Sequence, residues 1–161
     1  MMQKTRALTL AVLLACGVAG VAEAKGSAWA IGGEGTLDIA GNGGLPMAAM
    51  LMFHVPQLPL MFGVGITTTP AVGVTVDYWA AQGHIESVFD WYVGIGGYLT
   101  VSFASPASIS AGGRIPFGLQ AWPIGEVLEL FLEITPAVGV SVVPTGFDWH
   151  LQGAVGLRVW L

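Results

Sequence analysis

The sequence contains few charged residues. Asp, Glu, Lys and Arg together make up 9% of its 161 residues, whereas a typical soluble domain contains about 25%. Hydrophobic residues make up 54%, so a soluble fold would have too few polar groups to cover its surface, and the composition favours contact with lipid or a large partner. Lys and Arg total only 5 and the formal net charge is -5, which excludes the basic surface that nucleic-acid binding requires.

Cysteine occurs once, as Cys16, which excludes an internal disulfide and a metal site built from several cysteines. The remaining candidates for metal binding or catalysis are His54, His84 and His150. No H-x-x-H pair and no G-x-S-x-G motif is present in the sequence, so neither a zinc site nor a hydrolase nucleophile is indicated. We expect no catalytic residue, no cofactor and no metal, with His54 at a strand end, His84 in a loop and His150 inside the fold.

Residues 1–24 have the features of an export signal. Two positive charges precede an apolar segment, and Ala22-Glu23-Ala24 forms an A-x-A cleavage site. An alternative is lipoprotein processing at Cys16, because Leu13-Leu14-Ala15-Cys16 fits a lipobox. Both readings take the protein out of the cytoplasm. We therefore expect two parts: a signal peptide at 1–24 and one exported domain at 25–161.

The exported part shows no helical periodicity. Val, Ile, Phe, Trp and Thr are frequent in its apolar segments, and Gly or Pro recurs every few residues. Residues 39–76 contain no charged residue, but four prolines divide this stretch into pieces too short for a transmembrane helix. These prolines are Pro46, Pro56, Pro59 and Pro70.

Side chains alternate with period two. At 147–161 the odd positions carry no polar side chain, whereas the even positions include His150, Gln152 and Arg158. The same alternation occurs at 114–120 and at 128–135. Because neighbouring side chains of a strand point to opposite faces, each segment has one apolar and one polar face.

The alternation and the turn signals between segments predict eight strands, each about as long as a tilted bilayer-spanning strand. The expected strands are 27–39, 46–55, 60–68, 71–81, 88–103, 108–122, 127–141 and 147–161. One of the expected turns is Gln82-Gly83-His84. Pro116 and Pro136 each remove a backbone donor, so we expect a bulge or a strand end at both. Open edges are not tolerated in lipid, so the predicted fold is all-β, an eight-stranded antiparallel up-and-down transmembrane β-barrel.

Four stretches resemble a known family. They are D-W-Y-V-G-I-G-G-Y at 90–98, R-I-P-F-G-L-Q at 114–120, E-L-F-L-E-I-T-P at 129–136 and G-A-V-G-L-R-V-W-L at 153–161. They are similar to the small bacterial outer-membrane β-barrel proteins, including the spirochaete-type subgroup, related in architecture to the OmpA transmembrane domain. The resemblance covers the chain from Phe89 onward, and its motifs are structural rather than catalytic. The chain departs from that family in ending on Leu161 instead of an aromatic residue, and in its short predicted outer loops.

The inward-facing parity of the predicted strands collects the polar side chains. Hairpin pairing is expected to bring Arg114 and Gln120 beside Glu129 and Glu133, and Arg158 opposite Glu129, while barrel closure brings Arg158 near Glu34. Buried charges must be paired, and eight strands leave an interior that side chains just fill. The candidate site is therefore a lumen charge network, acting as a structural plug or as a gate. The complete inward set is Glu34, Asp38, Asp77, Asp90, Tyr92, Tyr98, Arg114, Gln120, Glu129, Glu133, His150, Gln152 and Arg158.

The outward parity is apolar and rich in aromatic residues near strand ends, as in the girdle of a membrane barrel. These residues are Trp29, Phe53, Phe62, Tyr78, Trp91, Phe103, Phe117, Phe147 and Trp149. The sequence thus predicts a non-enzymatic outer-membrane barrel with a structural role in the envelope. Its expected partners are outer-membrane lipid and, during biogenesis, the barrel-assembly machinery. A narrow porin-like solute channel or small-ligand barrel, and a soluble or lipid-anchored exported binding barrel, are the alternatives.

Overall fold

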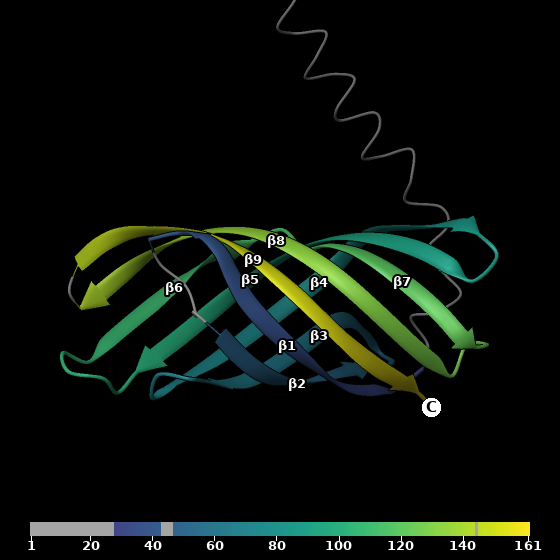
Figure 1. The fold of residues 1–161 in the computed structure, drawn as a ribbon, viewed down its shortest axis with the longest axis horizontal. Coiled ribbons are helices and arrows are strands. Elements are labelled where there is room, and N and C mark those ends of the chain that lie inside the picture. The colour runs from purple at the N-terminus through teal and green to yellow at the C-terminus, as the bar shows by residue number, and fades with distance from the viewer. Residues whose placement is uncertain (1–27, 43–46, 144) are drawn as a thin grey trace, which may run out of the picture.

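The computed structural model describes residues 28–42, 47–143 and 145–161 (Figure 1). The predicted signal peptide, its cleavage site and Cys16 lie outside these residues. No helix suited to crossing a membrane occurs in the described ranges. The strands are β1 (Ala30–Gly41), β2 (Met47–Val55), β3 (Leu58–Thr67), β4 (Ala71–Glu86), β5 (Phe89–Ser102), β6 (Ser108–Arg114), β7 (Phe117–Ile124), β8 (Leu128–Val143) and β9 (Thr145–Trp160).

The strands form a closed antiparallel ring. Apart from β6 and β7, which do not pair with each other, each strand pairs with the next along the chain, and β1 also pairs with β9. Because β6 and β7 both lie between β5 and β8, the nine segments occupy eight positions in the ring. The ribbon in Figure 1 shows the strands tilted around a common interior, as closure of a small barrel requires. The all-β antiparallel fold with eight positions in the ring confirms the predicted fold class and strand number.

The gap between β6 and β7 results from Pro116. The pairing with β5 keeps one register across the gap, since Gly96 pairs with Arg114 before it and Val93 with Phe117 after it. Pro116 cannot donate to β5, although its carbonyl still accepts a bond of 2.8 Å from the amide of Gly94. The expected strand end at Pro116 is therefore confirmed.

The expected bulge or strand end at Pro136 is wrong. β8 continues through Pro136, which pairs with Leu151 in an unbroken register with β9. On the other side of β8, the Pro136 carbonyl accepts a bond of 3.0 Å from the amide of Ile115. Only the hydrogen bond that the Pro136 nitrogen would donate is missing. That bond would have gone to the gap between β6 and β7, where the strand pairing is already interrupted.

The expected turn at Gln82-Gly83-His84 is also wrong. β4 continues to Glu86, and the chain reverses at Ser87 and Val88, where Ser87 has a φ of 57°. Gly83 is paired with Trp91, and a Cβ on Gly83 would lie 2.7 Å from the indole nitrogen of Trp91. This glycine makes room for a large ring in the sheet rather than forming a turn, so a turn signal and a packing signal look the same in the sequence.

The two faces of the barrel have opposite polarity. Leu130 and Leu157 are 44% and 47% exposed, whereas their neighbours Glu129 and Arg158 are 0% and 1% exposed. Large hydrophobic side chains are exposed on every strand of the ring. The polarity of the barrel wall is therefore inverted relative to a soluble protein, because its ion pairs are buried inside while its outer face is apolar.

The two ends of the barrel are distinguishable. The Leu161 amide donates to the Trp29 carbonyl at 2.8 Å, so the start of β1 and the end of β9 lie side by side at one end of the barrel. We call this the terminal end, and it also contains the turns at 56–57, 87–88 and 125–127. The opposite end contains the turns at 68–70 and 103–107.

Candidate functional site

The charged side chains that the sequence predicted to face inward gather in the barrel interior. The exposed fraction is 6% or less for each of the five residues of the predicted charge network. These residues are Glu34, Arg114, Glu129, Glu133 and Arg158. Asp77, from β4, is 3% exposed and also reaches this interior. The residues form two hydrogen-bonded clusters and one carboxylate, Glu34, that is hydrogen-bonded to neither.

The first cluster is centred on Glu129. The β8–β9 register places Glu129 opposite Arg158, and the Arg158 Nη1 donates to Glu129 Oε1 at 2.6 Å. Gln120 Nε2 donates to the same oxygen at 2.8 Å. Trp160 Nε1 donates to Oε2 at 2.7 Å. Both oxygens of this fully buried carboxylate are thus hydrogen-bonded, which offsets the loss of its hydration.

Aromatic rings surround the Arg158 side of this cluster. The guanidinium carbon of Arg158 lies 3.7 Å from the Phe131 ring centroid and 5.3 Å from that of Trp79. Trp79 stacks on Tyr92 with centroids 4.5 Å apart. Such cation–π contacts are strongest where water is excluded. We call this region the aromatic compartment; it comprises Trp79, Tyr92, Trp122, Phe131 and Trp160 around Glu129 and Arg158.

Sequence reasoning included Tyr92 but missed the rest of this aromatic lining. A signal was present, because Phe131, Trp122 and Trp160 share the strand parity of Glu129, Gln120 and Arg158. Trp79 likewise shares the parity of Asp77. The prediction placed hydrophobic residues on the outward face, so it did not identify the aromatic residues that face inward. Of the nine aromatic residues expected outside, seven are exposed, and Phe62 and Trp91 are half-buried.

The second cluster is centred on Arg114. Its Nε lies 3.1 Å from Asp77 Oδ1, and its Nη2 donates to Glu133 Oε1 at 2.8 Å. Glu133 also accepts hydrogen bonds from Tyr92 Oη at 2.5 Å and from Thr135 Oγ1 at 2.6 Å. Because Tyr92 also stacks on Trp79, it joins the second cluster to the aromatic compartment.

Glu34 lies in the same interior but is not hydrogen-bonded to either cluster. Closure of β1 against β9 sets Glu34 opposite Gly156 and Arg158 opposite Gly32, so the two charged residues occupy successive inward positions at the seam. Arg158 nevertheless bonds Glu129. Neither Glu34 oxygen accepts a hydrogen bond from a residue that the structure describes, although Glu34 is only 6% exposed.

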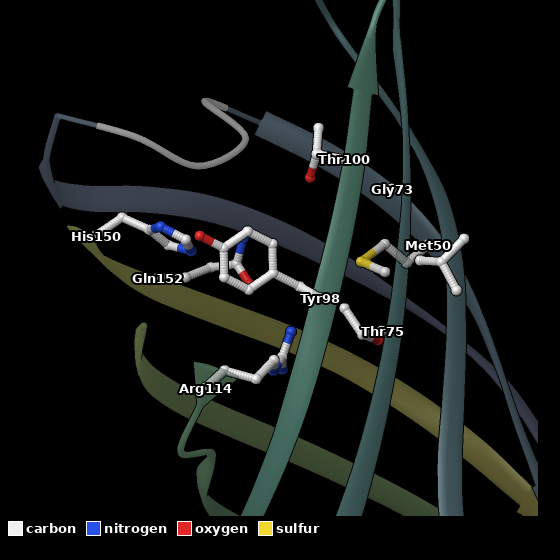
Figure 2. Close-up of a pocket in the computed structure, with 9 residues that line it drawn as sticks. Met50, Gly73, Thr75, Tyr98, Thr100, Arg114, His150 and Gln152 are labelled. Carbon is white, nitrogen blue, oxygen red and sulfur yellow. The ribbon is translucent and has the colours of Figure 1, made fainter. Parts of the chain in front are cut away.

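Toward the opposite end the interior is lined by hydroxyl and amide groups, with a small cavity. Figure 2 shows Tyr98 reaching toward His150, with Arg114 and Gln152 beside its ring. The cavity measures about 20 Å³, which is enough for one water molecule. We call this region the polar compartment; it comprises Asp38, Thr75, Tyr98, Thr100, Ser110, Ser141, Asp148, His150 and Gln152.

Glycines on the inward face make room for these large side chains. A Cβ on Gly118 would collide with the ring of Tyr92, and one on Gly96 would collide with the carboxylate of Asp77. The abundance of glycine, 24 in 161 residues, is thus partly a packing requirement of a narrow interior.

The histidines are distributed over separate environments. His54 Nδ1 lies 2.9 Å from the Ala28 carbonyl, and His150 packs edge-on against Tyr98 at a centroid distance of 5.2 Å. His84 lies on β4 with its Nδ1 2.7 Å from Asp90 Oδ1, so its expected place in a loop is wrong. Within the described ranges no group of three or more His, Cys, Asp or Glu side chains is arranged to hold a metal.

The fold and this interior together define a closed up-and-down β-barrel with buried ion pairs and an apolar outer face. The structure is similar to the crystal structure of Neisserial surface protein A (NspA), with a TM-score of 0.50 and 14% sequence identity over 83% of this chain and 96% of that chain. The sequence matches no family model and no curated protein. At this identity the likeness concerns the fold, and it supports the small-barrel architecture that the sequence resemblance implied.

Proposed function

We propose that the protein is an integral outer-membrane β-barrel whose lumen is plugged by paired charges, and that it serves a structural, non-enzymatic role in the cell envelope. The observation that carries this proposal is the inverted polarity of a closed barrel. Every strand exposes large apolar side chains, while the ionic groups of Arg114, Glu129 and Arg158 are buried. Only hydrocarbon accommodates such an outer face over a whole barrel, and only a closed ring satisfies its backbone there.

Three further observations support the proposal. Residues 1–24 have the features of an export signal, and the structurally similar NspA is by name a surface protein. The resemblance from Phe89 onward to OmpA-like barrels of the spirochaete-type subgroup points the same way. Lipid would cover the outer face, and the barrel-assembly machinery would insert the chain.

The first test is detergent refolding followed by gel electrophoresis with and without heating. A closed membrane barrel is expected to resist dodecyl sulfate and to migrate differently before and after boiling. Fractionation of expressing cells is the companion measurement, with the protein expected in detergent-soluble outer membranes. Recovery in the aqueous fraction would overturn the proposal and favour the soluble exported binding barrel instead.

The plugged lumen has its own test. The aromatic compartment closes the terminal end, because Trp122, Trp160 and Glu129 are 6%, 7% and 0% exposed. Refolded protein in planar bilayers is therefore expected to show no discrete openings. The double variant Arg158→Ala/Trp160→Ala removes two of the three hydrogen-bond partners of Glu129. It is expected to show discrete openings if it still migrates as a folded barrel.

A narrow channel is the second candidate function, favoured by the cavity and the unpaired polar atoms of the polar compartment. If the wild-type protein conducts, and Arg114→Gln or Glu133→Gln changes the conductance, the lumen is a gate and not a plug. The exposed turn variant Glu126→Gln serves as the matched control for a charge change outside the lumen.

A further inference from the structure

We propose that the polar compartment is a water-filled vestibule, open at the opposite end and blind at the aromatic compartment, that admits small cations and excludes anions. The proposal rests on the barrel of the proposed function but not on its location in a membrane.

The first support is a gradient of exposure along the interior. Inward-facing Gln120 and Glu129 near the terminal end are 2% and 0% exposed. Inward-facing Thr100, Ser110 and Ser141, near the opposite end, are half-buried. Inward-facing Ala48, Ala71 and Asp148, also near that end, are 4%, 6% and 9% exposed. Solvent therefore enters the opposite end beside β5, β6 and β8, and it does not reach the Glu129 cluster.

The second support is a set of polar side chains aimed into the cavity without a protein partner. Thr75 and His150 are 5% and 6% exposed, and both line the cavity. Neither Thr75 Oγ1 nor His150 Nδ1 has a hydrogen-bond partner among the described residues, and the same holds for Tyr98 Oη. Buried polar groups normally have hydrogen-bond partners, so we infer that water or a solute in the cavity bonds these atoms.

The third support is the sign of the charges. Asp148 accepts a hydrogen bond from Ser141, and Asp38, which is hydrogen-bonded to Gln152, keeps one buried oxygen without a partner among the described residues. Arg114, the arginine that lines the cavity in the described part of the chain, is held by Asp77 and Glu133. A recess with low-dielectric walls and unbalanced carboxylates concentrates cations and repels anions.

The expected occupants are hydrated monovalent cations or a small ammonium group rather than a chelated metal. The described residues include no set of three carboxylate or imidazole ligands arranged around one point. The cation is therefore attracted by the field of the vestibule and remains partly hydrated.

The test measures the reactivity of single cysteines placed in the refolded full-length chain, with Cys16→Ala as background. Thr100→Cys places a thiol at the cavity lining, and Met61→Cys places one in the core of the terminal end, where Met61 is 2% exposed. Thr68→Cys, in an exposed turn of the opposite end, gives the intrinsic reactivity. The probes are two methanethiosulfonates of similar size, one with a trimethylammonium group and one with a sulfonate.

Thr100→Cys is expected to react in the folded barrel, whereas Met61→Cys reacts only after unfolding. The rate ratio of cationic to anionic reagent at Thr100→Cys is expected to exceed the ratio at Thr68→Cys by about tenfold at low salt. Adding Asp38→Asn and Asp148→Asn is expected to bring the two ratios together.

Equal rates at Thr100→Cys and Met61→Cys would overturn the open vestibule, and equal rate ratios at Thr100→Cys and Thr68→Cys would overturn the selection of cations. Both measurements are made in detergent. They are therefore independent of fractionation and conductance, so failure of the vestibule is distinguishable from failure of the membrane assignment.

Discussion

At the scale of single residues, the interior depends on completed pairs. Glu129 uses both carboxylate oxygens, and Arg158 is held between that carboxylate and the Phe131 ring. A buried ion pair need not be more stabilising than well-packed apolar residues, but a half-removed pair leaves an uncompensated buried charge. The stability of the barrel should therefore respond to which partner is lost more than to how much volume is lost.

The variant Arg158→Met tests this dependence. It leaves Glu129 without its cationic partner, so we expect the free energy of unfolding to fall by about 3–5 kcal/mol. The measurement is the urea midpoint of the refolded barrel in lipid vesicles, followed by tryptophan fluorescence. The double variant Arg158→Met/Glu129→Leu is expected to recover part of the loss. If the double variant loses as much free energy of unfolding as Arg158→Met and Glu129→Leu lose together, the pairing argument is wrong.

Glycine packing gives a second prediction at this scale. In Gly118→Ala the added methyl group meets the ring of Tyr92, which must move and weaken its bond to Glu133. We expect a loss of roughly 1–3 kcal/mol, as for other overpacked sites. Gly35→Ala is the matched control, because nothing lies within 4 Å of its added Cβ. Equal urea midpoints for the two variants would contradict this account.

At the scale of elements, each strand divides its side chains between two environments. On β9 the outward residues are apolar, among them Phe147 and Val155, and the inward ones include His150 and Arg158. A one-residue slip would reverse every side chain of a strand. Register is therefore specified strongly, which explains why the ladders stay in step across the gap at Pro116.

Arginine substitutions at two depths along β9 test whether lipid covers its outer face. Val155 lies in the central part of the strand and is 63% exposed, and Phe147 lies near the start of the strand and is 65% exposed. If lipid covers this face, Val155→Arg should cost about 2–4 kcal/mol, while Phe147→Arg near the interface should cost about 0–1 kcal/mol. The readout is again unfolding from vesicles. Similar small costs at both positions would show that water covers the face.

At the scale of the whole molecule, the decisive feature is the seam between β1 and β9. It joins the two ends of the described chain, and Thr36 faces Ala154 across it on the inward side. Side chains at directly opposed positions have Cβ atoms about 4.5–5.5 Å apart, so a small adjustment permits a disulfide.

The double variant Thr36→Cys/Ala154→Cys, with Cys16→Ala, is accordingly expected to form a disulfide on mild oxidation. The resulting circular connection is expected to accelerate migration on a non-reducing gel after boiling. Thr36→Cys/Val155→Cys is the control, since Val155 points outward from the adjacent position. Cross-linking of both pairs, or of neither, would contradict the register at the seam.

The alternation of apolar and polar residues, together with the turn signals, was sufficient to predict the ring of eight positions and the polarity of its two faces. The reason is that a period of two is a local property of extended chains. Parity also placed Arg114, Glu129, Glu133 and Arg158 together on the inward face. Local reasoning failed at Pro136 and at Gln82-Gly83-His84, because a missing donor or a glycine has a different meaning when a neighbouring strand is interrupted or carries a large ring.

The sequence by itself determined that the chain forms strands with one apolar and one polar face, because composition and alternation are local properties of the sequence. Tertiary structure decided which charges meet: Arg158 bonds Glu129 and leaves Glu34 without a hydrogen bond from a described residue. It also decided that aromatic rings gather toward one end of the interior while hydroxyl groups line the other. The physical reason is that closure staggers the strands, so the height at which each inward side chain lies depends on the whole ring and not on its own strand.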